Sequence, residues 1–209
     1  IKMTDPVKGR TEAGRRREER ALRTRRRIVE TATVRFLQHG YSATSVESIA
    51  ADAGVATATV YQAFGTKAAV LARALDEAIV GDGDDTPLLE RGWVAVAREE
   101  RDPHRRLALV VDGAAAAAAR TSALKAMARD AAAIEPAIRE LLESDHTRRL
   151  LTQRALVEIV LGRSPTEDEV AVFYLLVNSP TQLLATEQLG WDEVRWREWL
   201  CDVLAQQYL

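Results

Sequence analysis

The feature that most constrains this 209-residue chain is its lack of the strict alternation of apolar and polar residues that half-buried strands show. Apolar residues instead recur every three or four positions along most of the sequence, which is the period of an amphipathic helix. Glycine, proline and capping residues interrupt this pattern at intervals of about one helix length. The sequence therefore predicts an all-α fold.

The clearest series of helix start and stop signals begins at Ile28. A helix from that residue is expected to end at Gly40, because glycine favours the residue just after a helix. Thr44 and Glu47 have the spacing of a capping box, which predicts the start of a short helix. Gly54 then supplies a tight turn.

A second short helix is predicted over residues 57–64, followed by a longer helix from Lys67 to Val80 that ends at Gly81. Two short helices joined by a tight turn, with a supporting helix after them, form the layout of a helix-turn-helix. That shape fits the major groove of DNA.

A strongly basic segment lies directly upstream of this layout. Between Lys8 and Arg27 there are ten Lys and Arg residues against three Glu, a local net charge of +7. A solvated, disordered tail is the simplest alternative reading of such a run. Its position beside a helix-turn-helix favours contact with phosphates, along the DNA backbone or in the minor groove.

Charge divides the chain into a basic head and an acidic body. Residues 1–80 carry 14 basic and 9 acidic side chains, and residues 81–209 carry 15 and 22. We therefore expect a basic arm over residues 1–22, a DNA-binding domain over 23–81 and a larger second domain over 82–209, with an acidic, Gly-rich linker over 81–86. The acidic body is repelled by nucleic acid, so DNA should bind through the head alone.

The segment from Thr44 to Lys67 resembles the DNA-binding head of TetR-family transcriptional regulators. The positions that match that family's pattern are Thr44, Ile49, Ala50, Ala53, Gly54, Val55, Thr59, Tyr61, Phe64 and Lys67. The resemblance is specific over about residues 25–75. It is looser at the C-terminus, where residues 178–200 are similar to the dimerisation region of one branch of the family.

The resemblance implies a homodimer that binds a palindromic double-stranded operator and places residues 57–63 of each head in a major groove. Phosphates would be held by Thr44 and Ser45, by the Tyr61 hydroxyl with its ring buried, and by Lys67. Together with base-reading and arm residues, the candidate DNA contacts are Thr44, Ser45, Thr57, Ala58, Thr59, Tyr61, Gln62, Lys67, Arg15, Arg16, Arg17 and Arg25.

Several positions depart from the family pattern. Ala56 stands where Ser commonly caps the recognition helix, Ala63 where a phosphate-binding His is common, and Gly65 where Pro is frequent. The recognition helix therefore carries no positive charge. Arg25 to Arg27 are expected at the start of the first helix, where positive charge is unfavourable unless a phosphate lies nearby.

The body is predicted to consist of further helices. Pro87 suits the first turn of a short helix, Asp102-Pro103 starts a long one through about Arg129, and Pro136 starts another that runs to about Gly162. The run of alanines from 114 to 119 makes a slim helix that either lets its neighbours approach or leaves room for a ligand.

A capping box formed by Ser164 and Glu167 is expected to start a helix over residues 167–178 that is apolar on nearly all sides. Such a helix should be central or lie at a subunit interface. Ser179-Pro180 should break it. A last helix begins near Trp191.

The resemblance implies that the body binds a small apolar or amphipathic effector and forms the dimer. Candidate effector-binding residues are Trp93, Leu107, Val111, Ala115, Met127, Leu151, Phe173 and Leu176. Candidate interface residues on the last helices are Val172, Leu176, Leu183, Trp196, Trp199, Leu200 and Val203.

Other chemistries have no support in the sequence. Cys201 is the single cysteine, which excludes an intrachain disulfide, fits a reducing cytoplasm and is more typical of a small buried residue than of a redox sensor. His39, His104 and His146 lack the spacing of a metal site. No catalytic or phosphate-loop motif and no apolar run of membrane-spanning length is found, so we expect no enzymatic activity, no cofactor, no metal and no membrane association.

The chain is therefore predicted to be a cytoplasmic, ligand-responsive DNA-binding regulator, most simply a repressor that an effector releases from its operator. The alternative is a ligand-insensitive DNA-binding co-regulator with the same head. An enzyme or carrier built on the helical body is a third class. Selective operator binding would exclude that third class, and a ligand-induced loss of binding would exclude the second.

Overall fold

The computed structural model describes residues 12–81 and 86–209, and no strand occurs among them. The all-α prediction is confirmed. The basic residues before Glu12 and most of the predicted linker lie outside the described residues. The elements are α1 (Glu12–Ala43), α2 (Val46–Asp52), α3 (Thr57–Phe64), α4 (Lys67–Val80), the 3-10 helix η1 (Leu88–Glu90), α5 (Gly92–Glu99), α6 (Pro103–Ala132), α7 (Pro136–Leu161), α8 (Glu167–Leu176), α9 (Ser179–Leu183), the π-helical turn η2 (Leu184–Gln188) and α10 (Glu193–Tyr208).

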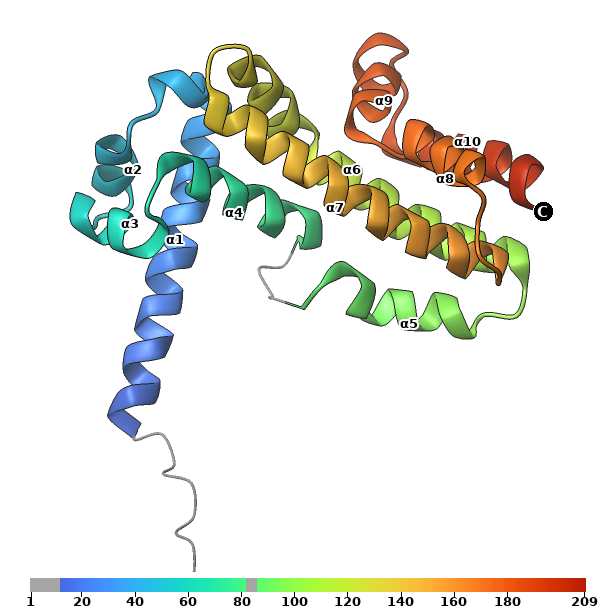
Figure 1. The fold of residues 1–209 in the computed structure, drawn as a ribbon, viewed down its shortest axis with the longest axis horizontal. Helices are drawn as coiled ribbons and strands as arrows, with labels where there is room; N and C mark the ends of the chain where they lie inside the picture. The colour runs from blue at the N-terminus through green and yellow to red at the C-terminus, as the bar shows by residue number, and fades with distance from the viewer. Residues whose placement is uncertain (1–11, 82–85) are drawn as a thin grey trace, which may run out of the picture.

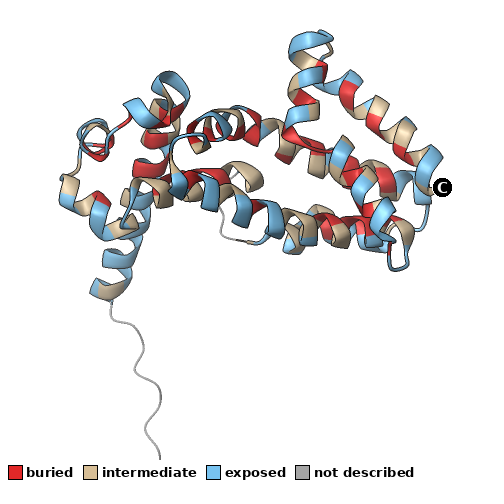
Figure 2. Ribbon diagram, turned by 45° about the horizontal axis from the view of Figure 1, so that its top comes forward, coloured by how far each residue is buried: buried red, intermediate tan, exposed pale blue. Residues whose placement is uncertain are grey.

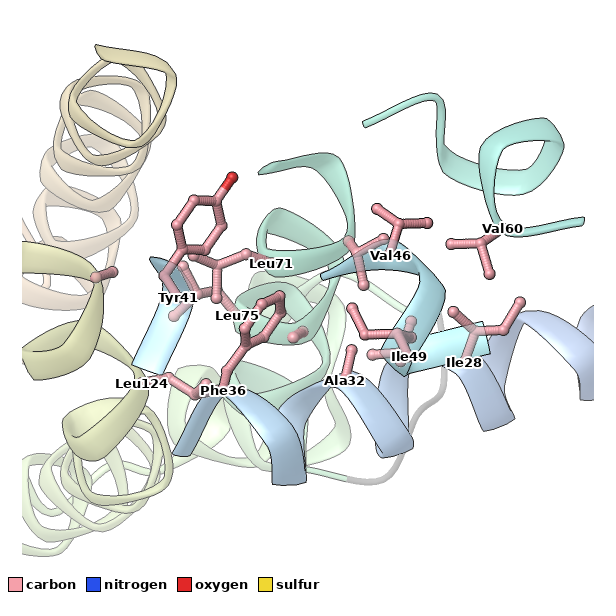
Figure 3. Close-up of a cluster of buried hydrophobic side chains, with 14 of the residues drawn as sticks. Ile28, Ala32, Phe36, Tyr41, Val46, Ile49, Val60, Leu71, Leu75 and Leu124 are labelled. Carbon is pink, nitrogen blue, oxygen red and sulfur yellow. The ribbon is translucent and has the colours of Figure 1, made fainter. Parts of the chain in front are cut away.

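The head is built from α1 to α4, which lie together at one end of the molecule (Figure 1). Figure 3 shows the side chains that meet between them: Phe36 and Ile28 from α1, Ile49 from α2, Val60 from α3 and Leu71 from α4. Each of these five is at most 1% exposed. The apolar stripes expected from the sequence therefore form one core.

Glycines end the predicted segments where the sequence placed them. The backbone leaves the helical region at Gly40, which has a φ of 79°, and turns at Gly54 with a φ of 61°. Gly81 follows α4 with a φ of 85°. Positive φ values strain side chains that carry a Cβ, so these positions favour glycine.

The first helix starts much earlier than the sequence predicted. It begins at Glu12, so Arg25 to Arg27 lie in the middle of α1 and the expectation that they start the helix is wrong. Glu12 forms ion pairs with Arg15 and Arg16 one turn further on, and such pairs support an exposed helix. No residue described before Ile28 is buried, as the exposed lower part of α1 shows (Figure 2).

Two predicted capping boxes are displaced by one or two residues. Ser45, not Thr44, caps α2, and its partner is Ser48 instead of Glu47. Thr166 caps α8, with Glu169 as its partner, in place of Ser164 and Glu167. In the first case Thr44 is fully buried, so its hydroxyl is not available to the helix terminus.

The body is organised around α6 and α7, which run side by side along the length of the molecule (Figure 1). Asp102 caps α6 and Pro103 occupies its first turn, as predicted. Leu107, Val111, Leu156 and Phe173 belong to a second core between α5, α6, α7, α8 and α10. The C-terminal half of α6 instead enters the head core with Leu124 and Ala128.

Within the described residues, α6 is the one helix long and apolar enough to cross a membrane by length and composition. The expectation that no apolar run reaches that length is wrong on this criterion. The reason is the alanine run, which raises the mean hydropathy of an 18-residue window to 1.4. Half of that window is buried and α6 packs on α1, α4, α5, α7, α9 and α10, as the central helix of a folded domain does.

The apolar helix near the C-terminus breaks slightly earlier than expected. Helix α8 ends at Leu176, and Asn178 caps the new helix α9, in which Pro180 occupies the first turn. The Asn178 side chain also donates to the carbonyls of Tyr174 and Leu175, which satisfies the end of α8. The predicted break is confirmed and its position is set by Asn178.

Candidate nucleic-acid interface and internal cavity

The helix-turn-helix presents one face of α3 to solvent. Val60 is buried in the head core, whereas Ala58, Tyr61 and Gln62 are exposed. Thr57 and Thr59 are half-buried at the edges of this face. The face therefore offers a small, largely uncharged surface on which Gln62 can reach a base edge.

The N-terminus of α3 has no side-chain cap. Ala56 occupies the capping position and its side chain accepts no hydrogen bond there, so the departure noted in the sequence is present in the structure. Thr57 does not replace it. The Thr59 N–H bonds to the Ala56 carbonyl, so the N–H groups of Thr57 and Ala58 are left for an outside acceptor such as a phosphate.

Positive charge reaches α3 from α1 instead. The Arg25 guanidinium donates to the Ala63 carbonyl oxygen at 3.1 Å. Arg25 is exposed, and it therefore places a cation at the C-terminal end of the recognition helix, where the helix dipole favours it. No sequence pattern predicts this contact between residues 38 positions apart.

Arg15, Arg16 and Arg17 lie on the exposed N-terminal part of α1. Two of them are held by Glu12, as described above. They are carried on the same helix as Arg25, so a helical ridge, and not only a tail, presents the basic residues.

Thr44 and Lys67, which were both predicted to bind phosphate, form hydrogen bonds within the protein. Thr44 is 0% exposed and its hydroxyl donates to the Gly40 carbonyl at 2.8 Å, so its side chain cannot reach a phosphate as expected. The neighbouring Ser45 is exposed and its hydroxyl accepts from the Ser48 N–H.

The Lys67 ammonium donates to the carbonyls of Tyr41 and Thr44, at 2.8 Å each, and lies 4.0 Å from the centre of the Tyr41 ring. Burial lowers its pKa from the ordinary lysine value. Lys67 thus links the start of α4 to the end of α1 and to Thr44, which follows it, and this contact supports the helix-turn-helix.

Tyr61 differs from expectation as well. Its side chain is 47% exposed, so the prediction of a buried ring is wrong. Val60 fills the core position next to it, and the Tyr61 ring and hydroxyl both remain on the outer face of α3. Phe64, one turn later, is the aromatic residue that packs on the head core.

A cavity of about 220 Å³ lies between the head-supporting helix α4 and the body. Its lining comes mainly from α4, α6, α7 and the start of α9, and comprises Asp76, Ile79, Leu88, Ala114, Ala117, Ala118, Thr121, Lys125, Asp145, Arg148, Arg149, Thr152, Gln153, Leu156, Val177, Asn178 and Ser179. Three of the six alanines in the run from 114 to 119 are among them. The interpretation that these small side chains leave room for a ligand is thus favoured.

None of the eight candidate effector-binding residues lines this cavity. Leu107, Val111, Ala115 and Phe173 are buried in the second core, and Trp93 and Leu176 pack against it. Met127 packs against the head core instead, and Leu151 is 66% exposed. The candidates were apolar, whereas ten of the seventeen residues that line the cavity are polar or charged.

Ion pairs organise the polar side of the cavity. Lys125 and Asp145 are 2.8 Å apart, with side chains 7% and 10% exposed. Burial lowers the pKa of Lys125, and the Asp145 carboxylate opposes that shift. Arg148 pairs with Asp76 at 3.3 Å, which links α7 to α4 at the cavity wall.

A second contact fixes the end of α4. The Arg120 guanidinium, from α6, donates to the carbonyls of Ala78 and Ile79 at 2.9 and 2.6 Å. These carbonyls belong to the last turn of α4, which lacks partners within the helix. A Cβ at Gly81 would lie 2.7 Å from the Arg120 Nε, so glycine leaves the space that this contact needs.

The C-terminal helices bury part of the predicted dimer interface within one subunit. Trp196 and Leu200 are at most 1% exposed, so they cannot reach a partner as expected. Val172, Leu176, Leu183, Trp199 and Val203 are only half-buried and stay candidates. Large apolar side chains that the sequence analysis did not select are exposed nearby: Leu175, Leu184, Leu189 and Val194.

Cys201 is half-buried on α10, and burial raises its pKa to about 11. A thiol with that pKa is protonated near neutral pH and reacts slowly. In the part of the chain that the structure describes, His, Cys, Asp and Glu side chains form no group of three suited to a metal ion.

Comparison with known proteins agrees with this arrangement. Residues 28–74 match the family model of bacterial regulatory proteins, tetR family. Residues 28–74 therefore match the DNA-binding head of TetR-family transcriptional regulators. No curated protein sequence matches the chain.

Solved structures with the same fold cover nearly the whole chain. A TetR-family regulator from Mesorhizobium loti has a TM-score of 0.67 at 19% identity, covering 91% of this chain and 96% of its own. NalD, the secondary repressor of the MexAB-OprM multidrug efflux pump in Pseudomonas aeruginosa, has 0.64 at 21%, with 90% and 96% covered. A protein from Saccharomonospora viridis described as a transcriptional regulator, in complex with choline, has 0.61 at 21%, with 87% and 95% covered.

Proposed function

We propose that this protein is a TetR-family regulator, a homodimeric repressor that works in the cytoplasm and leaves a palindromic operator when a small molecule fills the cavity. The observation that carries the proposal is the position of α4. Its first residue, Lys67, supports the helix-turn-helix, and its Asp76 and Ile79 line the cavity. One rigid helix therefore touches both the proposed DNA reader and the proposed effector site.

Operator recognition would depend on the exposed face of α3 and on the basic ridge of α1. Gln62 is the polar residue on that face best suited to reading a base, since its amide can pair bidentately with adenine. Arg25 and the arginines from 15 to 17 would contact phosphates, which favours every DNA sequence alike. The acidic body repels DNA and leaves the head as the binding surface.

Release would follow from a change in the position of α4. An effector in the cavity contacts the wall that Asp76 and Arg148 form, and it can release an operator only if it binds better to a subunit arrangement that DNA does not fit. The contact of α4 that such a ligand must change is the Asp76–Arg148 pair at the cavity wall, whereas Arg120 lies outside the cavity lining and holds the last turn of α4.

Dimerisation is proposed to use the outer face of α8 to α10. Large apolar residues exposed on one face of a protein mark an interaction surface. Replacing Leu175 with Glu should give a monomer in sedimentation and abolish operator binding. Leu22→Glu, at an equally exposed position on α1, is the control that should remain dimeric.

The proposal is tested by selecting bound sequences from a random pool of duplex DNA. We expect an inverted repeat with half-sites centred about 34 Å apart, and binding that weakens steeply with salt. Gln62→Ala should cost about 1–3 kcal/mol on the selected site and little on unrelated DNA. Enrichment of a single half-site, or of no sequence, would contradict the dimeric operator model.

A further inference from the structure

The cavity contains a buried hydrogen-bond acceptor that no protein group satisfies. Gln153 is 5% exposed, and its side-chain Nε2 donates to the Val177 carbonyl at 3.1 Å. That bond fixes the orientation of the amide, because a carbonyl can only accept. The Gln153 Oε1 is buried without a protein partner, so it can accept an N–H or O–H group of a molecule in the cavity.

Arg149 is the second unsatisfied group. Its Nε is also buried without a hydrogen-bond partner, and the guanidinium lies 4.3 Å from the centre of the Tyr174 ring. The other cations of the lining, Lys125 and Arg148, each face a carboxylate. No ion pair joins Arg149 to any described residue, so the lining carries an excess of one positive charge.

These two groups lie close together on one helix. Residues 149 and 153 are one turn apart on α7, which places them on the same face with their Cβ atoms about 6 Å apart. The lining from α6 has an apolar part, which consists of Ala114, Ala117 and Ala118 and precedes Thr121 and Lys125. A ligand that satisfies the site therefore carries an anionic group and a donor within a few bonds of each other, next to a short apolar body.

We infer that the effector is a small monocarboxylic acid with a hydroxyl or amide N–H close to its carboxylate. The carboxylate binds the Arg149 guanidinium, the donor binds the Gln153 Oε1 and the apolar body lies on the alanines of α6. This inference rests on the proposed function and names the chemical class of its effector. A volume of about 220 Å³ limits the ligand to a small molecule.

The same lining rejects quaternary amines such as the choline found with the regulator from Saccharomonospora viridis. The hydroxyl of choline can donate to the Gln153 Oε1, but choline has no anionic group for Arg149, and its positive charge is repelled there. Among the described residues that line the cavity there is no aromatic side chain, whereas such cations are commonly held by aromatic faces.

The test uses calorimetric titration of the full chain with four probes: 3-hydroxyhexanoate, hexanoate, hexane-1,3-diol and choline. The first should bind. Hexanoate lacks the donor and hexane-1,3-diol lacks the charge, so each should bind about tenfold more weakly or worse, and choline should not bind. Binding of choline with no binding of either acid would overturn the inference.

Variants assign the contacts. Arg149→Gln should weaken 3-hydroxyhexanoate at least tenfold while leaving hexane-1,3-diol unchanged, and Gln153→Leu should remove the preference for 3-hydroxyhexanoate over hexanoate. Arg154→Gln is the control, because Arg154 lies on the same helix but pairs with the exposed Glu167. Equal losses for all probes in Arg149→Gln would mean that the residue only supports the fold.

DNA binding separates this inference from the proposed function. If 3-hydroxyhexanoate binds the cavity and releases the selected operator, both stand. If a chemically different molecule releases the operator and the acids do not bind, the effector class is wrong and the repressor proposal stands. If 3-hydroxyhexanoate binds without any effect on operator affinity, the cavity ligand is identified correctly and the release mechanism is wrong.

Discussion

The head and the body treat their buried polar groups differently. Among the described residues of the head, no buried side-chain nitrogen or oxygen lacks a hydrogen-bond partner, and Thr44 at its centre donates to a backbone carbonyl. All five unpartnered atoms lie between residues 149 and 197: Arg149 Nε, Gln153 Oε1, Gln182 Oε1, Trp196 Nε1 and Arg197 Nε. Buried groups without partners cost free energy, and two of the five, Arg149 Nε and Gln153 Oε1, belong to residues that line the cavity.

This difference indicates which region is complete by itself. The described head satisfies its buried side-chain polar groups without a ligand, and its partner, a DNA groove, varies little in shape. The body keeps unsatisfied groups that a ligand can satisfy. Four predictions can break or sharpen this comparison, from the largest effect to the smallest.

The largest effect is expected at the buried ion pair of the body. Asp145→Asn leaves the Lys125 charge buried without its partner, so the free energy of unfolding should fall by about 3 kcal/mol or more in denaturant titration. Asp76→Asn breaks the exposed pair with Arg148 and should cost under about 1 kcal/mol. Similar losses for both variants would mean that the cavity is well hydrated and its charges are not truly buried.

In the head, Lys67→Met removes two charge-assisted hydrogen bonds between α4 and the end of α1. The expected loss of unfolding free energy is about 1.5–3 kcal/mol, whereas the exposed Arg26→Met should cost under about 1 kcal/mol. The salt dependence of DNA binding separates the two roles of Lys67. If Lys67→Met lowers the slope of log binding constant against log salt concentration by about one unit per subunit, Lys67 also contacts a phosphate.

The comparison itself is tested by one polar-to-apolar change in each region. Thr44→Val in the head removes a satisfied hydroxyl and leaves the Gly40 carbonyl with one fewer donor, which should cost about 1 kcal/mol. Gln182→Met in the body removes an amide whose Oε1 has no partner, and should change stability by less than about 0.5 kcal/mol. Equal losses of unfolding free energy in the two variants would show that the Gln182 Oε1 has a hydrogen-bond partner.

Acid should weaken a charged contact in each region. The Arg163 guanidinium and the Thr166 N–H hold the pKa of Glu169 in the body at about 2, and in the head the Arg35 guanidinium lowers the pKa of Asp52. A carboxyl with a lowered pKa in the folded state stabilises the protein above its unfolded pKa, and that contribution is lost as the pH falls from about 4.5 towards 2. Glu169→Gln should therefore flatten the loss of stability over that interval, measured by denaturation at each pH. An unchanged pH profile would assign the acid sensitivity to other groups.

Local rules were sufficient for most of the head. Glycine positions, the apolar stripes of α1 and α2 and the bounds of α3 and α4 follow from short-range chemistry, so they could be read from the sequence. The caps were misplaced where two hydroxyl residues stand side by side, as with Thr44 and Ser45. Burial decides between such neighbours, and burial depends on packing that the sequence does not state.

The cavity could not be predicted in the same way. Apolar periodicity selects residues that face inward, but it does not distinguish a packed position such as Phe173 from one that borders a space. That distinction depends on how α4, α6 and α7 cross. One local signal was available: polar and charged residues at positions 145, 149 and 153 repeat on a single face of α7, where a core helix would carry apolar ones.

The contact between Arg120 and the last turn of α4 provides a point about which that helix can tilt. Its 14 residues span about 21 Å, from the Ala78 and Ile79 carbonyls, which Arg120 of α6 holds, to Lys67, which is bonded to the end of α1. A tilt of about 3° about the Arg120 contact moves Lys67, and the part of the head bonded to it, by about 1 Å. In the proposed dimer a twofold axis applies the opposite displacement to the second head. A small motion near the cavity thereby becomes a larger change in the distance between the two heads of the proposed dimer.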